Sequence, residues 1–197
     1  MQIEELKISG SWLIKFKKFD DNRGFFYESF RADLLGQTLN RKFEIKQTNT
    51  SISSKGSLRG IHYALVPPSQ AKFIQCQKGS IQDFIIDIRV NSPTFGKYQM
   101  VELKEDNPQA IFIEEGLAHA FVALEDKTLV TYYVNQTYNP IREKGINPFD
   151  KYLNISWPKL DLKVSEKDRK EIDLNEALKL NLLPTYEDAK NYIGTLA

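Results

Sequence analysis

The sequence is poor in cysteine and in net charge, and each shortage excludes a class of protein. Cys76 is the only cysteine, so no internal disulfide can form and a reducing compartment is expected. The 27 Lys and Arg residues are balanced by 26 Asp and Glu residues, whereas nucleic-acid-binding proteins usually carry a basic excess. No apolar run approaches the roughly 18 residues of a membrane helix, and no signal-peptide pattern opens the chain. We therefore expect a cytoplasmic protein that binds neither nucleic acid nor a membrane.

The two histidines, His62 and His119, limit metal chemistry. A barrel built around a metal commonly uses three histidines and a carboxylate, which this chain cannot supply. The count still allows a two-histidine, one-carboxylate iron site, although we disfavour it. Cys76 lies in an alternating run at residues 73–77 and is predicted to be a packed thiol rather than a nucleophile. No glycine-rich phosphate loop is present. The sequence therefore predicts no metal and no cofactor.

The chain does contain many short β-like runs separated by turn signals such as Lys55-Gly56 and Lys78-Gly79. Short strands at near-regular spacing predict an all-β sandwich or barrel rather than a βαβ fold. The predicted strands are residues 12–16, 43–48, 58–64, 73–77, 81–88, 98–103, 111–113, 120–124 and 129–134.

Helical signals are few and gather towards the end of the chain. Residues 31–35 are predicted to form a short helix, and residues 173–180 a second helix capped by Asp173. Thr185 and Asp188 resemble a capping box that opens a last helix, ending at about Ile193. The 197 residues are expected to form a single domain, with a barrel at about residues 12–160 and a helical tail at about 165–197.

A series of sequence blocks surrounds the two histidines and runs in order across about residues 12–170. The blocks are residues 19–28, 47–51, 55–63, 67–72, 83–96, 115–121, 132–133, 157–158 and 165–168. Together they resemble the dTDP-4-dehydrorhamnose 3,5-epimerase family of sugar-nucleotide epimerases. The resemblance implies a cupin-type jelly-roll barrel with short C-terminal helices, acting without a cofactor on a dTDP-4-keto-6-deoxy sugar.

Two positions depart from the commonest pattern of that family. Ala64 follows His62-Tyr63 where glutamine is frequent, and Ala120 follows His119 where glycine is frequent. These features resemble a subgroup that includes rhamnose-pathway enzymes and antibiotic-sugar epimerases that act at one carbon. Inversion at both C3 and C5 is the leading prediction. A 3-only or 5-only epimerase, a ketoisomerase and a non-catalytic sugar-binding barrel remain as alternatives.

Epimerisation beside a ketone makes three chemical demands. The C–H bonds at C3 and C5 are acidic because either carbanion delocalises onto the C4 oxygen as an enolate. The site therefore needs a base on one face, an acid on the other and a cation for the oxygen. His62 is the predicted base, since an imidazole has its pKa near the working pH. By resemblance Asp168 is its carboxylate partner, with Asp83, in an otherwise apolar strand, as the rival.

Tyr132 is the candidate acid, and Tyr133, which faces the other way along the same strand, is the core alternative. Lys72, on the strand face of Ile74 and Cys76, is the predicted partner of the C4 oxygen. Strict alternation of the strand at residues 58–64 would put His62 on one face and Arg59 on the other.

The diphosphate requires fixed cations, and Arg23 and Arg59 are the predicted ones because guanidinium forks match phosphate oxygens. A surface salt bridge is the more usual fate of a single arginine. The resemblance implies further contacts to sugar or nucleotide, from Phe26, Glu28, Gln47, Asn49, His119 and Tyr138. Asp83 is also predicted to belong to the substrate-binding site. It also implies a homodimer in which residues 23–28 reach the site of the neighbouring subunit.

Overall fold

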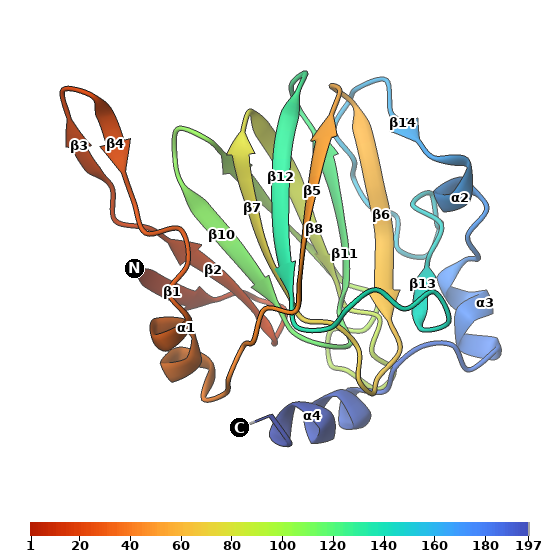
Figure 1. Ribbon diagram of the computed structural model, residues 1–197. Helices are drawn as coiled ribbons and strands as arrows, with labels where there is room; N and C mark the ends of the chain where they lie inside the picture. Colours follow the sequence, from red (N-terminus) through yellow and green to blue (C-terminus); the bar gives the residue numbers. More distant parts are fainter. Residues whose placement is uncertain (197) are drawn as a thin grey trace.

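The computed structural model describes residues 1–196, in which two large, mainly antiparallel sheets pack face to face as a barrel (Figure 1). The first sheet has the order β1-β2-β10-β7-β12-β5, and the second has the order β13-β6-β11-β8-β9, with β14 beside β6. The strands are β1 (Gln2–Glu5), β2 (Ser11–Lys15), β3 (Phe19–Asp21), β4 (Gly24–Phe26), β5 (Gln47–Ser53), β6 (Ser57–Ala64), β7 (Lys72–Lys78), β8 (Ser80–Ile86), β9 (Tyr98–Lys104), β10 (Gln109–Ile113), β11 (Ala118–Ala123), β12 (Thr128–Val134), β13 (Glu143–Gly145) and β14 (Lys163–Val164). The predicted all-β class is confirmed.

Apolar side chains from both sheets meet in the space between them. Ile74 of β7 and Val130 of β12 belong to the same buried cluster as Ile85 of β8 and Phe121 of β11. Burying one such side chain contributes about 1.5–3 kcal/mol, so the alternation of apolar residues along the strands holds the sheets together. The core fills one part of the barrel and leaves the remainder to polar side chains.

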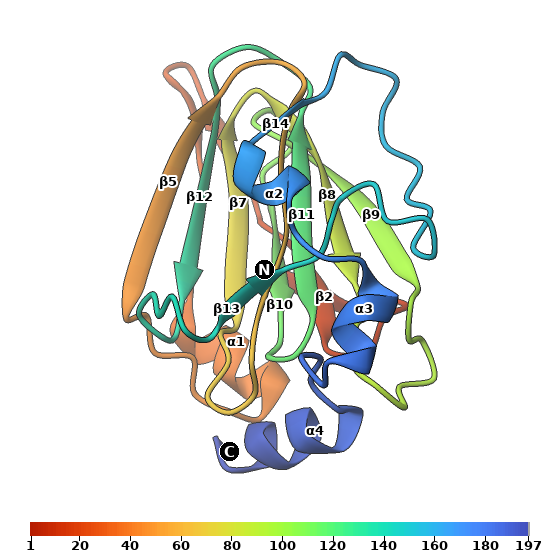
Figure 2. The same ribbon diagram turned by 90° about the vertical axis from the view of Figure 1, so that its right-hand side faces the viewer.

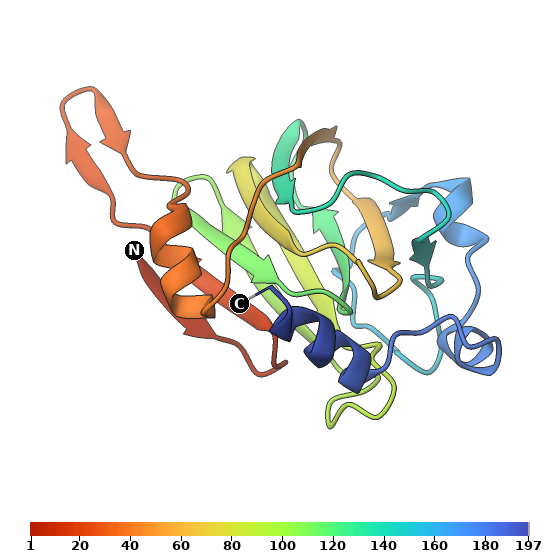
Figure 3. The same cartoon turned by 60° about the horizontal axis from the view of Figure 1, so that its bottom comes forward.

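A hairpin of β3 and β4 projects from the barrel, as Figures 1 and 3 show. Its turn is closed by Asp21, whose side chain accepts a hydrogen bond from the backbone of Arg23 at 2.8 Å. Gly24 follows with a φ of +130°, a conformation that favours glycine. Phe26 at the end of β4 is 66% exposed, so the hairpin presents apolar surface to its surroundings.

Residues 1–196 also form four helices, which lie outside the sheets. They are α1 (Ala32–Leu39), α2 (Glu166–Arg169), α3 (Leu174–Lys179) and α4 (Tyr186–Gly194). Figure 2 shows α2 above α3, with α4 at the base of the molecule. The capping box at Thr185 is confirmed, since its hydroxyl accepts from the backbone of Asp188 at 3.0 Å. Helix α2 was not predicted because four residues are too short to show helical periodicity. None of the helices in residues 1–196 is long and apolar enough to cross a membrane.

One predicted strand was misplaced. Residues 43–48 were expected to pair, but β5 begins only at Gln47 and runs to Ser53. Phe43 is buried against α1 outside any strand, whereas the polar residues of β5 are held by backbone bonds to β12. The remaining predicted strands are present, with ends displaced by at most two residues. The short strands β1, β3, β4, β13 and β14 were missed.

Candidate active site

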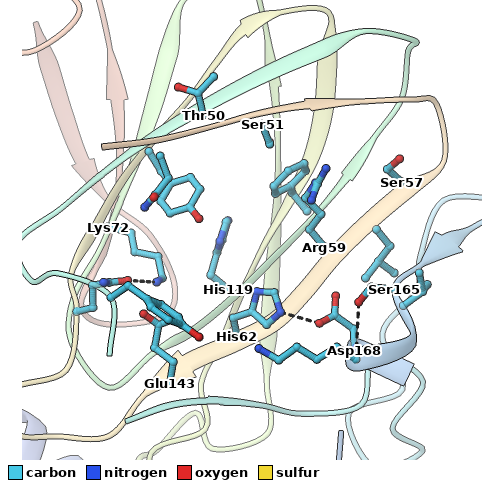
Figure 4. Close-up of a pocket in the computed structure, with 18 of the residues that line it drawn as sticks. Thr50, Ser51, Ser57, Arg59, His62, Lys72, His119, Glu143, Ser165 and Asp168 are labelled. Carbon is cyan, nitrogen blue, oxygen red and sulfur yellow. Dashed lines mark hydrogen bonds and ion pairs between the residues drawn. The ribbon is translucent and has the colours of Figure 1, made fainter. Parts of the chain in front are cut away.

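A cavity of about 850 Å³ opens between the two sheets and gathers most of the predicted site residues (Figure 4). Its walls come from both sheets and from α2. The predicted residues that line it are His62, Arg59, His119, Lys72, Tyr132, Gln47, Asn49, Tyr138 and Asp168. Residues more than 100 positions apart in the sequence therefore contribute to one site.

Strand register decides which side chains lie side by side on each wall of this cavity. His62 of β6 lies directly opposite His119 of β11 in the second sheet. In the first sheet Tyr132 lies opposite Ile74, two residues along β7 from Lys72, so Tyr132 and Lys72 share a face. The histidines thus lie on one wall of the cavity, and the tyrosine and the lysine on the other.

His62 is paired with Asp168, as predicted. Its Nε2 lies 2.8 Å from Oδ1 of Asp168, a contact drawn in Figure 4. Asp168 is fixed by its own backbone N–H, which donates to the hydroxyl of Ser165 at 3.0 Å. Burial raises the pKa of Asp168, but the hydrogen bond and charge of His62, together with hydrogen bonds from the backbone of Gly60 and from Ser165, keep this pKa below its usual value. An ionised Asp168 only accepts, so Nε2 of His62 carries a proton, and in the neutral ring Nδ1 is then the basic nitrogen.

The rival pairing of His62 with Asp83 is wrong, because Asp83 pairs with the other histidine. Nε2 of His119 lies 2.8 Å from Oδ2 of Asp83, a fully buried carboxylate. Strand order gives the reason: β11 lies between β6 and β8, so a side chain on β8 reaches His119 before it reaches His62. The His62 side chain is 40% exposed, whereas that of His119 is only 10% exposed, so His62 is the more accessible base.

Strict alternation along β6 is also wrong. His62 pairs with His119 and Arg59 with Phe121, so three steps on β6 match two steps on β11. This β-bulge turns Arg59 to the same side as His62, and both side chains line the cavity. Gly60 lies inside the bulge with a φ of +121°, and a Cβ there would approach the carbonyl oxygen of His119 to 2.7 Å. The bulge therefore depends on glycine.

We expect Gly60→Ala to destabilise the fold by about 2–3 kcal/mol, because it adds backbone strain and a clash inside the bulge. Urea denaturation measures the change. Gly194→Ala is the matched control, since Gly194 has open space around its Cα and no strained φ. A Gly60→Ala variant as stable as the starting protein would contradict the assignment of the bulge to glycine.

Lys72 is buried at the cavity wall, with 8% of its surface exposed. Its Nζ donates a 2.7 Å hydrogen bond to Oε1 of Gln70, marked by a dashed line in Figure 4. Burial lowers the pKa of Lys72 to about 8, partly opposed by the charge of Glu143. Tyr132 has its pKa raised, first by burial and then by the charge of Glu143. Phe73 and Tyr133 face the opposite side, in another apolar cluster, so the predicted strand faces are confirmed.

The predicted ligand contacts on β5, Gln47 and Asn49, form a small hydrogen-bonded group with the backbone of Tyr138. Nε2 of Gln47 donates to Oδ1 of Asn49 at 2.8 Å, and Oε1 of Gln47 accepts from the backbone of Tyr138 at 2.8 Å. Tyr138 is 55% exposed at the cavity rim. Arg59 donates through Nε to the hydroxyl of Ser53 at 3.1 Å, which leaves its terminal nitrogens for a ligand.

The hairpin residues do not reach this cavity within one chain. Arg23 forms an exposed ion pair with Asp21 at 2.6 Å, and Glu28 pairs with Arg31 at 3.1 Å. Phe26 is exposed on the projecting hairpin. Any part these residues play in the site needs a second copy of the chain and stays a prediction.

Other cavity residues were not singled out from the sequence. They are Glu143, Gln70, Lys144, Lys163, Lys167, Thr48, Thr50, Ser51, Ser57, Leu58, Phe121, Val164 and Ser165. Glu143 lies on β13, a strand of three residues that shows no sequence signal. Gln70 lies in the block at residues 67–72 that carries the family resemblance, but no pattern marked it individually.

Two further predictions concern the thiol of Cys76 and the binding of a metal ion. Cys76 is buried, and burial raises the pKa of its thiol to about 12, as expected of a packed side chain. Within residues 1–196, no three His, Cys, Asp or Glu side chains gather at distances that suit a metal ion.

Comparison with known proteins extends over the whole chain. Residues 5–176 match the model of the family described as dTDP-4-dehydrorhamnose 3,5-epimerase. A relative of that name from Mycolicibacterium smegmatis is 40% identical over 197 residues, covering 100% of this chain and 97% of the relative. The solved rmlC epimerase of Mycobacterium tuberculosis has a TM-score of 0.97 at 36% identity and covers 100% of both chains. A 3'-monoepimerase from Streptomyces bikiniensis in complex with dTDP-quinovose has a TM-score of 0.93 at 35% identity, with 97% of each chain covered.

The fold and these matches define the class of the protein as an epimerase, an isomerase built on a cupin-type barrel. The sequence blocks around the two histidines pointed to the same class. The chain belongs to the dTDP-4-dehydrorhamnose 3,5-epimerase family.

Proposed function

We propose that the protein inverts both C3 and C5 of dTDP-4-dehydro-6-deoxy-D-glucose and so forms dTDP-4-dehydro-L-rhamnose, without a cofactor. The observation that carries the proposal is the carboxylate-paired His62 on one cavity wall, with Tyr132 and Lys72 on the other. The name of the Mycolicibacterium relative supports this substrate class, and the dTDP-sugar bound to the Streptomyces epimerase supports a sugar-nucleotide ligand.

Each inversion proceeds in two proton transfers. His62 takes the proton from the carbon beside the ketone, and the electron pair of that C–H bond moves onto the C4 oxygen as an enolate. Asp168 stabilises the imidazolium that results. Lys72 donates to the enolate oxygen from a buried position, where a charge interacts strongly. Tyr132 returns a proton to the opposite face of the carbon, so the configuration inverts.

The remaining residues bind the nucleotide part of the substrate. Arg59 offers its terminal nitrogens to the diphosphate, while Gln47, Asn49, His119 and Tyr138 contact sugar or base. We further propose a homodimer in which Arg23, Phe26 and Glu28 of one subunit complete the site of the other. The exposed apolar hairpin supports this arrangement.

We also propose that residues 1–197 form one domain. The C-terminal part supplies Asp168 to the cavity, and Leu174 and Ala177 of α3 pack in the same cluster as Ile61 of β6. A tail that contributes to both the site and the core is expected to fold with the barrel as one unit.

The decisive test is incubation with dTDP-4-keto-6-deoxyglucose in deuterated water, followed at C3 and C5 by NMR. Deuterium at both carbons supports the 3,5-epimerase. Deuterium at C3 alone would instead support the narrower activity named for the Streptomyces bikiniensis neighbour. Deuterium at C5 alone would support a 5-epimerase. Binding of the substrate without deuterium exchange at either carbon would support a non-catalytic sugar-binding barrel.

Tyr132→Phe separates proton removal from inversion. We expect this variant to lose inversion by about 10²-fold, because the acid on the opposite face is gone. His62 can still remove a proton and return a deuteron to the same face, so exchange with retention is expected to persist. NMR of the product configuration measures inversion, and deuterium incorporation measures exchange. Equal loss of both in the variant would argue against Tyr132 as the acid.

A further inference from the structure

Lys72 has a long flexible side chain, yet the proposed chemistry needs its ammonium at a fixed point. Ordering such a side chain costs about 2 kcal/mol of rotamer entropy. The hydrogen bond to Oε1 of Gln70 is the one that the Lys72 side chain makes within residues 1–196. Gln70 is itself 7% exposed and lies on the cavity lining.

The orientation of the Gln70 amide is determined by its second contact. Nε2 of Gln70 donates to the backbone carbonyl oxygen of Gln136 at 2.9 Å. A carbonyl oxygen can only accept, so the amide nitrogen must face Gln136 and the amide oxygen must face Lys72. Lys72 is therefore held by an acceptor that cannot turn away.

The segment that carries Gln70 is fixed on both sides. The hydroxyl of Ser69 donates to the carbonyl of Ala64 at 3.0 Å and accepts from the backbone of Gly116 at 3.2 Å. The backbone of Ala71 donates to Oδ1 of Asn135 at 2.8 Å. Three consecutive residues are thus hydrogen-bonded to neighbouring segments, which holds the backbone at Gln70 rigidly in place.

A buried ion pair further stabilises the position of this segment. Asn135 donates through Nδ2 to Glu115 at 2.8 Å, and Glu115 accepts two hydrogen bonds from the guanidinium of Arg41 at 2.6 and 2.8 Å. Both ionic side chains are almost fully buried. A bidentate pair of this kind fixes direction as well as distance, so Asn135 is itself held in place.

We propose that Gln70 is the positioning residue for Lys72, whose ammonium its amide oxygen holds at the cavity wall. This inference rests on the proposed role of Lys72 at the C4 oxygen. A neutral partner is chemically suited to that role, because it holds the ammonium without neutralising its positive charge. A carboxylate in the same place would compete with the enolate for that charge.

Two isosteric variants test the proposal in opposite directions. Gln70→Met removes the acceptor, so the titration midpoint of Lys72 is expected to move below its starting value of about 8. Gln70→Glu adds a negative charge beside the ammonium, so the midpoint is expected to move above that value. Carbon-13 NMR of the lysine side chains in the intact chain measures both shifts, with the Lys72 signal assigned from its loss in Lys72→Met.

Kinetics provide the second measurement. Both variants are expected to lower kcat by about tenfold, the effect of one lost or misdirected charge-assisted hydrogen bond. Affinity for dTDP, measured by calorimetry, is expected to stay unchanged, because Gln70 acts through Lys72 and not on the nucleotide. Equal losses of kcat and dTDP affinity would indicate a merely structural role and would overturn the proposal.

Gln75→Met is the matched control. Gln75 is a buried glutamine on β7, the strand of Lys72, but it bonds to the backbone of Ser29 and does not line the cavity. Its replacement is expected to leave the Lys72 midpoint in place. A midpoint unmoved in both Gln70 variants, or moved as far in Gln75→Met, would overturn the inference. Failure of the proposed function is distinguishable, since it would show as absence of carbon exchange in the unaltered protein.

Discussion

His62→Ala is expected to reduce deuterium incorporation at C3 and C5 by about 10³–10⁴-fold. The cavity holds one other imidazole, His119, and its side chain is only 10% exposed. Removing His62 therefore removes the accessible base, and it also leaves Asp168 without its partner. Solvent exchange followed by NMR measures the loss, and calorimetry with dTDP checks that the nucleotide part still binds.

His119→Ala is the comparison that gives this result its meaning. His119 is paired with a carboxylate at the same 2.8 Å separation and lies in the same cavity. We expect its removal to raise KM while exchange at carbon remains measurable. If instead His62→Ala exchanged normally and His119→Ala did not, the roles of the two histidines would be reversed.

Lys72→Met is expected to lower kcat by about 10²–10³-fold, the size of effect seen when one donor to a developing oxyanion is lost. Methionine keeps the length of the side chain and removes its charge. The substrate can still bind through its nucleotide, so dTDP affinity is expected to persist. Lys78→Met, at the exposed far end of β7 and outside the cavity, is the matched control and is expected to keep full activity.

The lowered pKa of Lys72 also predicts an upper pH limit for activity. Burial lowers the pKa of Lys72 to about 8, so the ammonium is present below that pH and is lost as the pH rises through it. Because kcat/KM reports the free enzyme, it is expected to fall above about pH 8. A plateau of kcat/KM well beyond pH 9 would show that the charge of Lys72 is not required.

The sequence determined the β-rich class and most of the strands, because the alternation of apolar and polar residues can be read along one strand without knowing which strand it pairs with. It was enough to put Lys72 and Phe73 on opposite faces of one strand, and Tyr132 and Tyr133 on opposite faces of another, since side-chain direction follows from period two. Family resemblance added Asp168, which no local pattern would have singled out.

Tertiary structure decided the rest. Whether Asp83 or Asp168 pairs with His62 depends on the order of strands in the sheet, and strand order is a long-range property. The bulge at Gly60 turns the Arg59 side chain into the cavity, whereas strict alternation predicted the opposite face. A bulge is an extra residue on one strand relative to its partner, so the sequence of one strand alone does not reveal it. Local patterns therefore determined which way most side chains point, whereas the packing of distant strands determined what those side chains meet.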